Sequence, residues 1–307
     1  MATQWMKAAR AAGVVVVLTG LAACGSTSGS TTGAAGTTKS SAASQDAVAG
    51  MDHGSTEAAD PMAGMHAMDG MEATIGDGTK ATENGFTLSV KSPPTSVGRQ
   101  QIQLLVAGPD GMAVTDAKVE QTKKMHLIVV RSDLSGYQHV HPELAADGTW
   151  SVEADLTSPG RWHLIADVTP IAGAATPARV ALGLDLAVPG TSAADTPLPA
   201  VATAASADGY DVVLDGGLAT ASEQTLTFTI SKGGSLATGI TEYLGTGGHL
   251  VALQQGTLGY THLHSGTAPG PELTFTARAP KAGRYRLFLQ FATGATVHTA
   301  EFTVEVA

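Results

Sequence analysis

Residues 125–141 read MHLIVVRSDLSGYQHVH, and residues 248–264 read GHLVALQQGTLGYTHLH. The two stretches align without a gap at an offset of 249 − 126 = 123 residues. The register continues beyond them, because PGRWHLIAD at 159–167 matches AGRYRLFLQ at 282–290 and GFTLSV at 85–90 resembles GYDVVL at 209–214. The chain therefore contains an internal repeat, with units of roughly 100 residues.

Within each unit, short apolar segments rich in Val, Leu, Thr and Phe are separated by turn signals such as SPP at 92–94, GPDG at 108–111 and SPG at 158–160. No helical periodicity extends beyond about two turns. This pattern predicts an all-β protein with two tandem immunoglobulin-like antiparallel β-sandwiches of about seven strands each. The expected boundaries are 84–189 and 208–307, with a Pro/Ala-rich linker at 190–207.

The duplicated histidines follow the pattern H-x12-H-x-H. Residues i and i+2 of a strand share a face, so His139 and His141 are expected on one side of a strand and Val140 on the other, toward a core. A hairpin would return this pair beside His126. Three imidazoles per repeat are typical of His₃ zinc sites and type 2 copper sites. The predicted Cu(II) or Zn(II) ligands are His126, His139 and His141 in the first repeat and His249, His262 and His264 in the second.

Two questions about these histidines stay open in the sequence. The same residues in both copies could instead be structural, hydrogen-bonded histidines inherited from one ancestor. His298 has no counterpart in the first repeat, and it would be a fourth ligand of the second site if its strand lies beside the HxH strand.

The composition excludes several classes of protein. Lys plus Arg is 17 and Asp plus Glu is 27, so the formal net charge of −10 argues against nucleic-acid binding through a basic patch. A single cysteine, Cys24, leaves no disulfide framework, zinc ribbon or iron–sulfur cluster. GxSxG, HExxH, P-loop and dinucleotide-binding motifs are absent, so the sequence does not predict an enzyme.

The N-terminus is typical of a bacterial lipoprotein. Lys7 and Arg10 precede an apolar stretch at 11–21, which ends in the sequence LAAC at 21–24. This pattern predicts a signal peptide at 1–23, lipidation of Cys24, and an extracytoplasmic protein anchored to the bacterial cell membrane. The alternative is an ordinary secretory signal in which the cysteine occurs by chance.

A stalk is predicted at 24–83, because its Gly, Ser, Thr and Ala residues cannot bury enough apolar surface to fold. Within it, residues 51–71 form a Met/His segment that contains an unbroken MxxM ladder. Thioethers are soft ligands and select Cu(I). The predicted ligands are Met51, His53, Met62, Met65, His66, Met68 and Met71. Non-specific antioxidant methionines and a helix-packing role are the alternatives.

The strings DLSGYQHVHPE at 133–143 and VHTAEFTVEV at 297–306, with the paired GYTHLH, resemble a group of actinobacterial secreted or lipid-anchored proteins of unassigned function. These are described as heavy-metal-binding-domain or copper-associated proteins. The resemblance covers residues 84–307 and implies metal handling without a known mechanism. The second repeat departs from the pattern, since Ser265 replaces the proline that follows His141, so the local turn is expected to differ.

These features together predict a lipid-anchored cell-surface copper-binding protein that sequesters, buffers or transfers the metal. Its expected partners are metal ions, the membrane, and a copper transporter or cuproenzyme, but no nucleic acid. One alternative is a zinc-binding lipoprotein. The other is a tandem β-sandwich surface interaction module whose histidines are structural.

Overall fold

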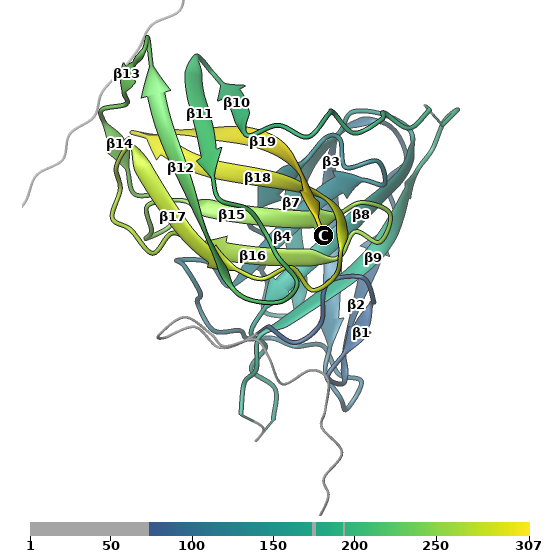
Figure 1. Ribbon diagram of the computed structural model, residues 1–307. Coiled ribbons are helices and arrows are strands. Elements are labelled where there is room, and N and C mark those ends of the chain that lie inside the picture. The colour runs from purple at the N-terminus through teal and green to yellow at the C-terminus, as the bar shows by residue number, and fades with distance from the viewer. Residues whose placement is uncertain (1–73, 174–175, 193) are drawn as a thin grey trace, which may run out of the picture. The chain divides into compact units, whose positions relative to one another are not determined.

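The computed structural model describes residues 74–173, 176–192 and 194–307, all of which belong to one compact unit. The described residues form nineteen β-strands and no helix (Figure 1). Accordingly, this part of the chain contains no helix long and apolar enough to cross a membrane. The predicted signal peptide, Cys24 and the Met/His segment lie outside the described residues.

The first repeat is a sandwich of two antiparallel sheets. One sheet has the order β1 (Thr82–Glu83), β2 (Phe86–Ser92), β3 (Gly98–Ala107), β7 (Thr149–Leu156), β6 (Glu143–Leu144). The other has the order β5 (Gln138–Val140), β4 (Met125–Arg131), β8 (Gly160–Val168), β9 (Val180–Val188). The long strands β2, β3 and β7 of the first sheet face the four strands of the second, which is the arrangement of an immunoglobulin-like sandwich.

The second repeat has the same architecture. Its first sheet has the order β10 (Ala204–Ala207), β11 (Tyr210–Asp215), β12 (Gln224–Lys232), β13 (Ser235–Leu236), with β17 (Glu272–Ala277) also paired to β12. Its second has the order β14 (Ile240–Thr241), β18 (Gly283–Thr293), β15 (His249–Gln254), β16 (Tyr260–His264), and β19 (Thr296–Val306) pairs with β18. The fold prediction of two tandem antiparallel β-sandwiches is therefore confirmed.

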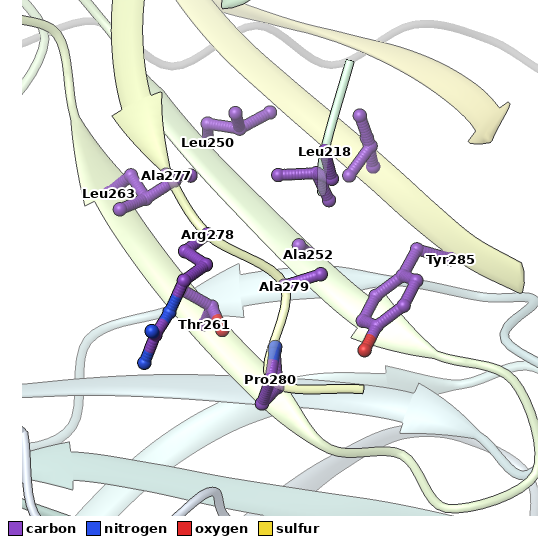
Figure 2. A pocket seen from close by; sticks show the side chains of 11 residues that line it. Leu218, Leu250, Ala252, Thr261, Leu263, Ala277, Arg278, Ala279, Pro280 and Tyr285 are labelled. Atoms are coloured by element: carbon purple, nitrogen blue, oxygen red, sulfur yellow. The ribbon is translucent and has the colours of Figure 1, made fainter. Parts of the chain in front are cut away.

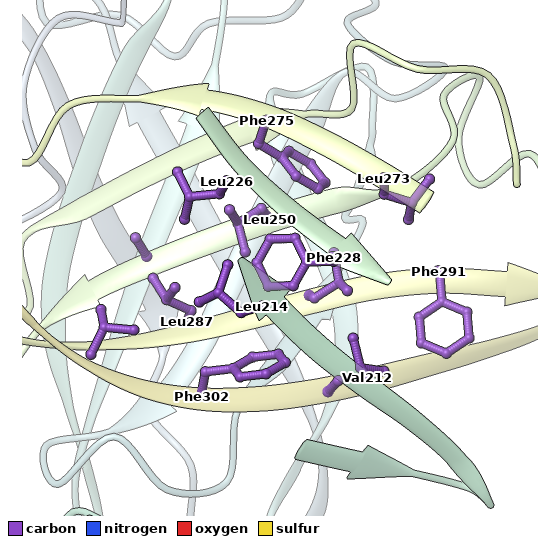
Figure 3. Close-up of a cluster of buried hydrophobic side chains, with 14 of the residues drawn as sticks. Val212, Leu214, Leu226, Phe228, Leu250, Leu273, Phe275, Leu287, Phe291 and Phe302 are labelled. Carbon is purple, nitrogen blue, oxygen red and sulfur yellow. The ribbon is translucent and has the colours of Figure 1, made fainter. Parts of the chain in front are cut away.

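Each sandwich has its own apolar core, built by strands whose alternate residues point inward. In the first repeat, Leu104, Leu127 and Trp162 belong to this core. In the second, Phe228 and Phe302 lie among aliphatic side chains between the two sheets (Figure 3).

A third apolar cluster contains residues of both repeats. Ile128, Val130 and Ile165 come from the sheet β5-β4-β8-β9, and Val251 and Phe288 come from the sheet β14-β18-β15-β16. These two sheets therefore pack on each other through their outer faces. The contact explains why every residue of β4 and β15 is buried, although an antiparallel strand commonly leaves one face in water.

The structure extends the folded region beyond the predicted boundaries. Residues 204–207, which the sequence analysis assigned to the linker, form β10 and pair with β11. Residues 74–83, assigned to the stalk, include β1 and a backbone bridge from Ile75 to Val180. Backbone hydrogen bonds hold these added residues in the fold, and such bonds leave no side-chain pattern in the sequence.

Candidate metal centre between the repeats

Two equivalent hairpins position the six duplicated histidines. In the second repeat, β15 and β16 pair so that His249 lies opposite His264 and Val251 opposite His262. In the first, β4 and β5 pair Ile128 with His139. The intervening residues point the other way, since Val140 packs against the first core and Leu263 against the second. Each hairpin thus presents three imidazoles on its outer face.

The turn of the first hairpin requires glycine. Gly136 has a φ of +65°, and a β-carbon there would come within 2.8 Å of the Trp162 ring. The two hairpins end differently, as the sequence suggested: β16 continues to His264, and the Ser265 N–H donates to the Gly248 carbonyl at 2.9 Å. Pro142, which follows His141, has no N–H for such a bond, and β5 ends at Val140.

The six histidines form one group, here called the His cluster: His126, His139, His141, His249, His262 and His264. Within the repeats, ring centroids lie 5.1 Å apart for His126 and His139 and 5.1 Å apart for His249 and His262. Between the repeats, His139 and His262 are also 5.1 Å apart. The expectation of a separate three-histidine site in each repeat therefore changes to one combined site.

Contacts across the interface are reciprocal. His139 Nδ1 lies 2.8 Å from Gln290 Oε1 of the second repeat. His262 Nδ1 lies 3.5 Å from Asp167 Oδ2 of the first repeat and 3.5 Å from Arg179 Nη2. Asp167 and Gln290 occupy equivalent positions, 290 − 167 = 123 residues apart. Each repeat therefore supplies the residue that orients a histidine of the other.

These partners fix the tautomers of three rings. A backbone carbonyl can only accept, so His126 Nε2 donates to Glu120 O at 3.1 Å and His249 Nε2 donates to Tyr243 O at 3.2 Å. Both Nδ1 atoms are then without a proton. His139 Nδ1 likewise donates to the Gln290 amide oxygen, which leaves its Nε2 bare. His262 Nδ1 lies 3.5 Å from Asp167 Oδ2, which only accepts, and 3.5 Å from Arg179 Nη2, which only donates, so these contacts do not fix its tautomer.

Ring nitrogens face each other in two pairs, and in the first pair both nitrogens are bare. His126 Nδ1 is 2.9 Å from His139 Nε2, and His249 Nδ1 is 2.9 Å from His262 Nε2. Two lone pairs at this distance repel unless a proton or a cation lies between them. One ring nitrogen from each of the four residues lies within 4.8 Å of the others, so this group could hold a metal ion.

Burial favours the neutral rings that a metal requires. It lowers the pKa of His126, and it lowers the pKa of His139 and His262 well below the ordinary value. Burial, with smaller contributions from nearby charged groups, also lowers the pKa of His141 and His264 to about 3. Protonation is therefore a costly way to relieve the facing lone pairs, and a metal cation is chemically better suited.

A buried charged group borders the cluster on one side. Arg179 Nε donates to Asp167 Oδ1 at 2.7 Å, and the Tyr260 hydroxyl donates to Asp167 Oδ2 at 2.8 Å. Burial raises the pKa of Asp167, but the Arg179 guanidinium more than offsets this, so the carboxyl pKa is lowered overall. The other side carries the neutral amide of Gln290. The sequence analysis did not identify Asp167, Arg179 or Gln290, although the equivalence of 167 and 290 was visible in the alignment.

His298 is not part of the cluster. Its Nδ1 is 2.9 Å from Asp208 Oδ2, its Nε2 is 2.8 Å from Thr293 Oγ1, and its ring packs on Phe291. It lies on β19, which pairs with β18 and not with β16, so the strand adjacency that the prediction needed does not occur. His163, which the repeat does not share, is bonded to Asp185 and to the carbonyl of Gly78.

A small pocket lies elsewhere, within the second sandwich, and is lined mainly by apolar side chains that include Leu250, Ala252 and Tyr285 (Figure 2). Arg278 is the charged residue in its lining, and none of the cluster histidines takes part. This pocket offers no ligand set or acid–base pair, so the His cluster is the stronger candidate for function.

Comparisons with solved structures give only distant likenesses. Red sea bream transglutaminase matches at 10% identity and a TM-score of 0.21, over 74% of this chain and 32% of that one. A DUF3823 family protein from Parabacteroides merdae matches at 12% identity and a TM-score of 0.21, over 69% of this chain and 100% of that one. Fibronectin(III)-like modules of Clostridium thermocellum CbhA match at 12% identity and a TM-score of 0.19, over 72% of this chain and 93% of that one. TM-scores this low support no inference about this chain.

The chain spans 32% or less of the length of the first three solved structures that it matches. A search of curated proteins finds no significant match. One family model matches twice, at residues 80–182 and 205–307, and so covers most of the chain. By these two matches, the chain belongs to the family described as a domain of unknown function, DUF8832, of which it carries two tandem copies.

Proposed function

We propose that this protein is a lipid-anchored, extracytoplasmic copper-binding protein, and that its His cluster holds one copper ion between the two repeats. The observation that carries this proposal is the convergence of four buried imidazole nitrogens within 4.8 Å of one another. The other nitrogens of His126, His139 and His249 are bonded to a backbone carbonyl or an amide oxygen, which is the usual outer shell of a histidine ligand. Neutral imidazoles are good ligands for copper and zinc.

The spacing of the nitrogens favours copper over zinc. With metal–nitrogen bonds of about 2.05 Å, two ligands at 90° are about 2.9 Å apart, whereas tetrahedral ligands are about 3.35 Å apart. The facing pairs His126/His139 and His249/His262 are each 2.9 Å apart. Nitrogens 2.9 Å apart are closer than tetrahedral ligands, so the separations within the pairs fit a tetragonal Cu(II) site better than tetrahedral zinc.

The rest of the proposal follows from the sequence. The LAAC motif at 21–24 would place Cys24 at the lipid anchor, and the Met/His segment at 51–71 would bind Cu(I) at the cell surface. A copper transporter or a cuproenzyme would be the source or the acceptor of the metal. The job that these features support is to sequester, buffer or transfer copper outside the cytoplasm.

Metal titration of residues 24–307 carrying Cys24→Ser tests the proposal, with Cu(I), Cu(II) and Zn(II) measured in parallel. We expect one tight Cu(II) per chain with a four-nitrogen electron paramagnetic resonance spectrum. The variant His139→Gln/His262→Gln should lose this ion, because it removes one imidazole nitrogen from each facing pair. His298→Asn is the matched control and should retain it, since His298 is bonded to Asp208 and Thr293.

Other results would replace the proposal. Tight Zn(II) with weak Cu(II) at the same histidines would identify a zinc-binding lipoprotein. No tight divalent ion at all would favour a tandem-sandwich interaction module with structural histidines. Two ions per chain would restore separate sites and contradict the combined cluster.

A further inference from the structure

Two members of the His cluster differ from the other four in their exposure. The four histidines whose nitrogens could hold the metal are buried, with exposed fractions between 0% and 8%. His141 and His264 are half-buried. His141 lies against the buried rings of its own repeat, with centroid distances of 5.0 Å to His126 and 4.8 Å to His139. His141 and His264 are therefore the members of the cluster that are nearest to solvent.

The backbone holds these two residues differently. His264 lies opposite His249 within the ladder of β15 with β16. The equivalent pair, His126 and His141, lies outside the ladder of β4 with β5, which stops at Val140. The proline that follows His141 has no N–H with which to extend this ladder. Because fewer backbone hydrogen bonds hold it, His141 can move at a lower cost in free energy than His264.

The imidazole of His141 also has a nitrogen that makes no hydrogen bond. Its Nε2 is shielded from solvent and has no hydrogen-bond partner among the residues that the structure describes. Leaving a buried polar atom without a partner is costly, so its presence requires an explanation. The ring stands edge-on to His126, which together with His139 forms the facing pair of bare nitrogens 2.9 Å apart. An additional ligand is thus available beside one half of the metal position.

On the basis of the proposed function, we propose that His141 is a relay ligand through which copper enters and leaves the His cluster. The ion first exchanges a ligand of its carrier for the His141 imidazole, and then exchanges His141 for the facing nitrogens of His126 and His139. Each exchange breaks one Cu(II)–ligand bond and forms another, and the ion keeps its charge. In the loaded site His141 is not a ligand, since the four ligands are the residues whose nitrogens lie within 4.8 Å of one another.

A positive charge near His141 indicates the kind of carrier. Burial is the main reason that the pKa of His141 is lowered to about 3, and the ammonium of Lys123 contributes, so this ammonium lies near the ring. It repels a free Cu(II) ion and attracts a copper complex with negative charge. We therefore expect copper to arrive on an anionic carboxylate ligand, a class that Cu(II)–nitrilotriacetate represents.

Equivalent substitutions in the two repeats test the relay. The variants His141→Ala and His264→Ala, in residues 24–307 with Cys24→Ser, are mixed with Cu(II)–nitrilotriacetate in a stopped-flow instrument, and release is followed after adding excess EDTA. We expect His141→Ala to slow loading and release at least about tenfold more than His264→Ala, which corresponds to about 1.4 kcal/mol in the barrier. The four-nitrogen electron paramagnetic resonance spectrum and the equilibrium affinity of His141→Ala should match those of the parent. His298→Asn is the control outside the cluster and should keep the parent rates.

Added imidazole separates a relay ligand from a structural residue. Free imidazole can occupy the space left by His141→Ala and bind copper, so it should restore fast loading of this variant. Circular dichroism checks that the variant is folded, and His141→Gln takes its place if it is not.

Three results would overturn the relay while leaving the copper site in place: equal rates for the two alanine variants, slow loading that imidazole does not restore, or a changed spectrum for His141→Ala. The last would make His141 a ligand of the bound ion. If the parent chain takes up no Cu(II), then the proposed function itself fails. The two failures are therefore distinguishable in one experiment.

Discussion

Replacing Asp167 by Leu should strongly destabilise the metal-free protein, because Asp167 is the buried group on which three side chains converge. Its carboxylate is 1% exposed and the Arg179 guanidinium 5% exposed. Removing the carboxylate leaves a buried, unpaired cation, at a cost of about 3–5 kcal/mol. It also removes the acceptor of the Tyr260 hydroxyl, at about 1–3 kcal/mol. We expect the free energy of unfolding to fall by at least about 4 kcal/mol.

Urea denaturation of four proteins measures this effect: the parent chain, Asp167→Leu, Arg179→Met and the double variant. Because apolar residues often replace a buried ion pair at little cost, the double variant should be more stable than either single variant. Glu305→Gln is the matched control. It breaks the Arg284–Glu305 pair, whose side chains are 47% and 54% exposed, and should cost less than about 1 kcal/mol.

Two results would refute this reasoning. Additive losses in the double variant would mean that Asp167 and Arg179 do not act as a pair. A loss below about 1 kcal/mol for Asp167→Leu would mean that the guanidinium finds water or another partner, so that the repeats do not enclose it.

Further predictions concern pH, the interface between the repeats and the contact of residues 75–80 with β9. The pKa of His141 and His264 is about 3 in the folded protein, against 6.5 in the unfolded chain, so the metal-free protein should keep its full stability above pH 6.5 and lose stability as the pH falls toward 3. At pH 5 each of the two residues should lower the free energy of unfolding by about 2 kcal/mol. Equal urea midpoints at pH 7.5 and pH 5 would contradict this prediction. Phe288→Ala removes a ring stacked on Tyr137 at a centroid distance of 3.8 Å and leaves a cavity between the repeats. The free energy of unfolding, measured by urea denaturation, should fall by about 3–5 kcal/mol. A fall of less than about 1 kcal/mol would show that the interface closes around the cavity. Gly183→Ala places a methyl group against the Gly78 carbonyl, so it should release residues 75–80 from the edge of β9. Hydrogen exchange at the amides of Ala181 and residue 183, which donate to the Ile75 and Lys80 carbonyls, should become faster; unchanged exchange would show that residues 75–80 shift without detaching.

Much of the fold was visible in the sequence because the repeat and the strand alternation are local properties. The offset of 123 residues indicated two copies of one domain, and the spacing of His139 and His141 put both on one face, with Val140 turned toward the core. The sequence of β4 also indicates that both faces of this strand are covered. An antiparallel strand with water on one face alternates, whereas LIVV at 127–130 is continuously apolar, which is expected when both faces are covered.

The candidate site could be predicted only in part, because its assembly depends on how the repeats meet. Asp167 and Gln290 are equivalent by the alignment, yet their roles toward His262 and His139 lie across the interface. The two copies share no carboxylate at this position, since residue 167 is an acid and residue 290 an amide. His298 drew attention as a histidine near the last strand, and only the pairing of β19 with β18 separates it from the cluster.

The reciprocity of these contacts explains why there is one His cluster and not two. Two copies that meet through the same surface do so as in a symmetric dimer, in which residue i of one copy contacts residue j of the other and j contacts i. His139 with Gln290 and His262 with Asp167 follow that rule. Residues close to such an axis necessarily meet their own equivalents, and His126 and His249 do so at a centroid distance of 5.9 Å. Duplication therefore turned one set of three histidines into a single group of six, and the carboxylate at 167 opposite the amide at 290 gives its two halves different surroundings.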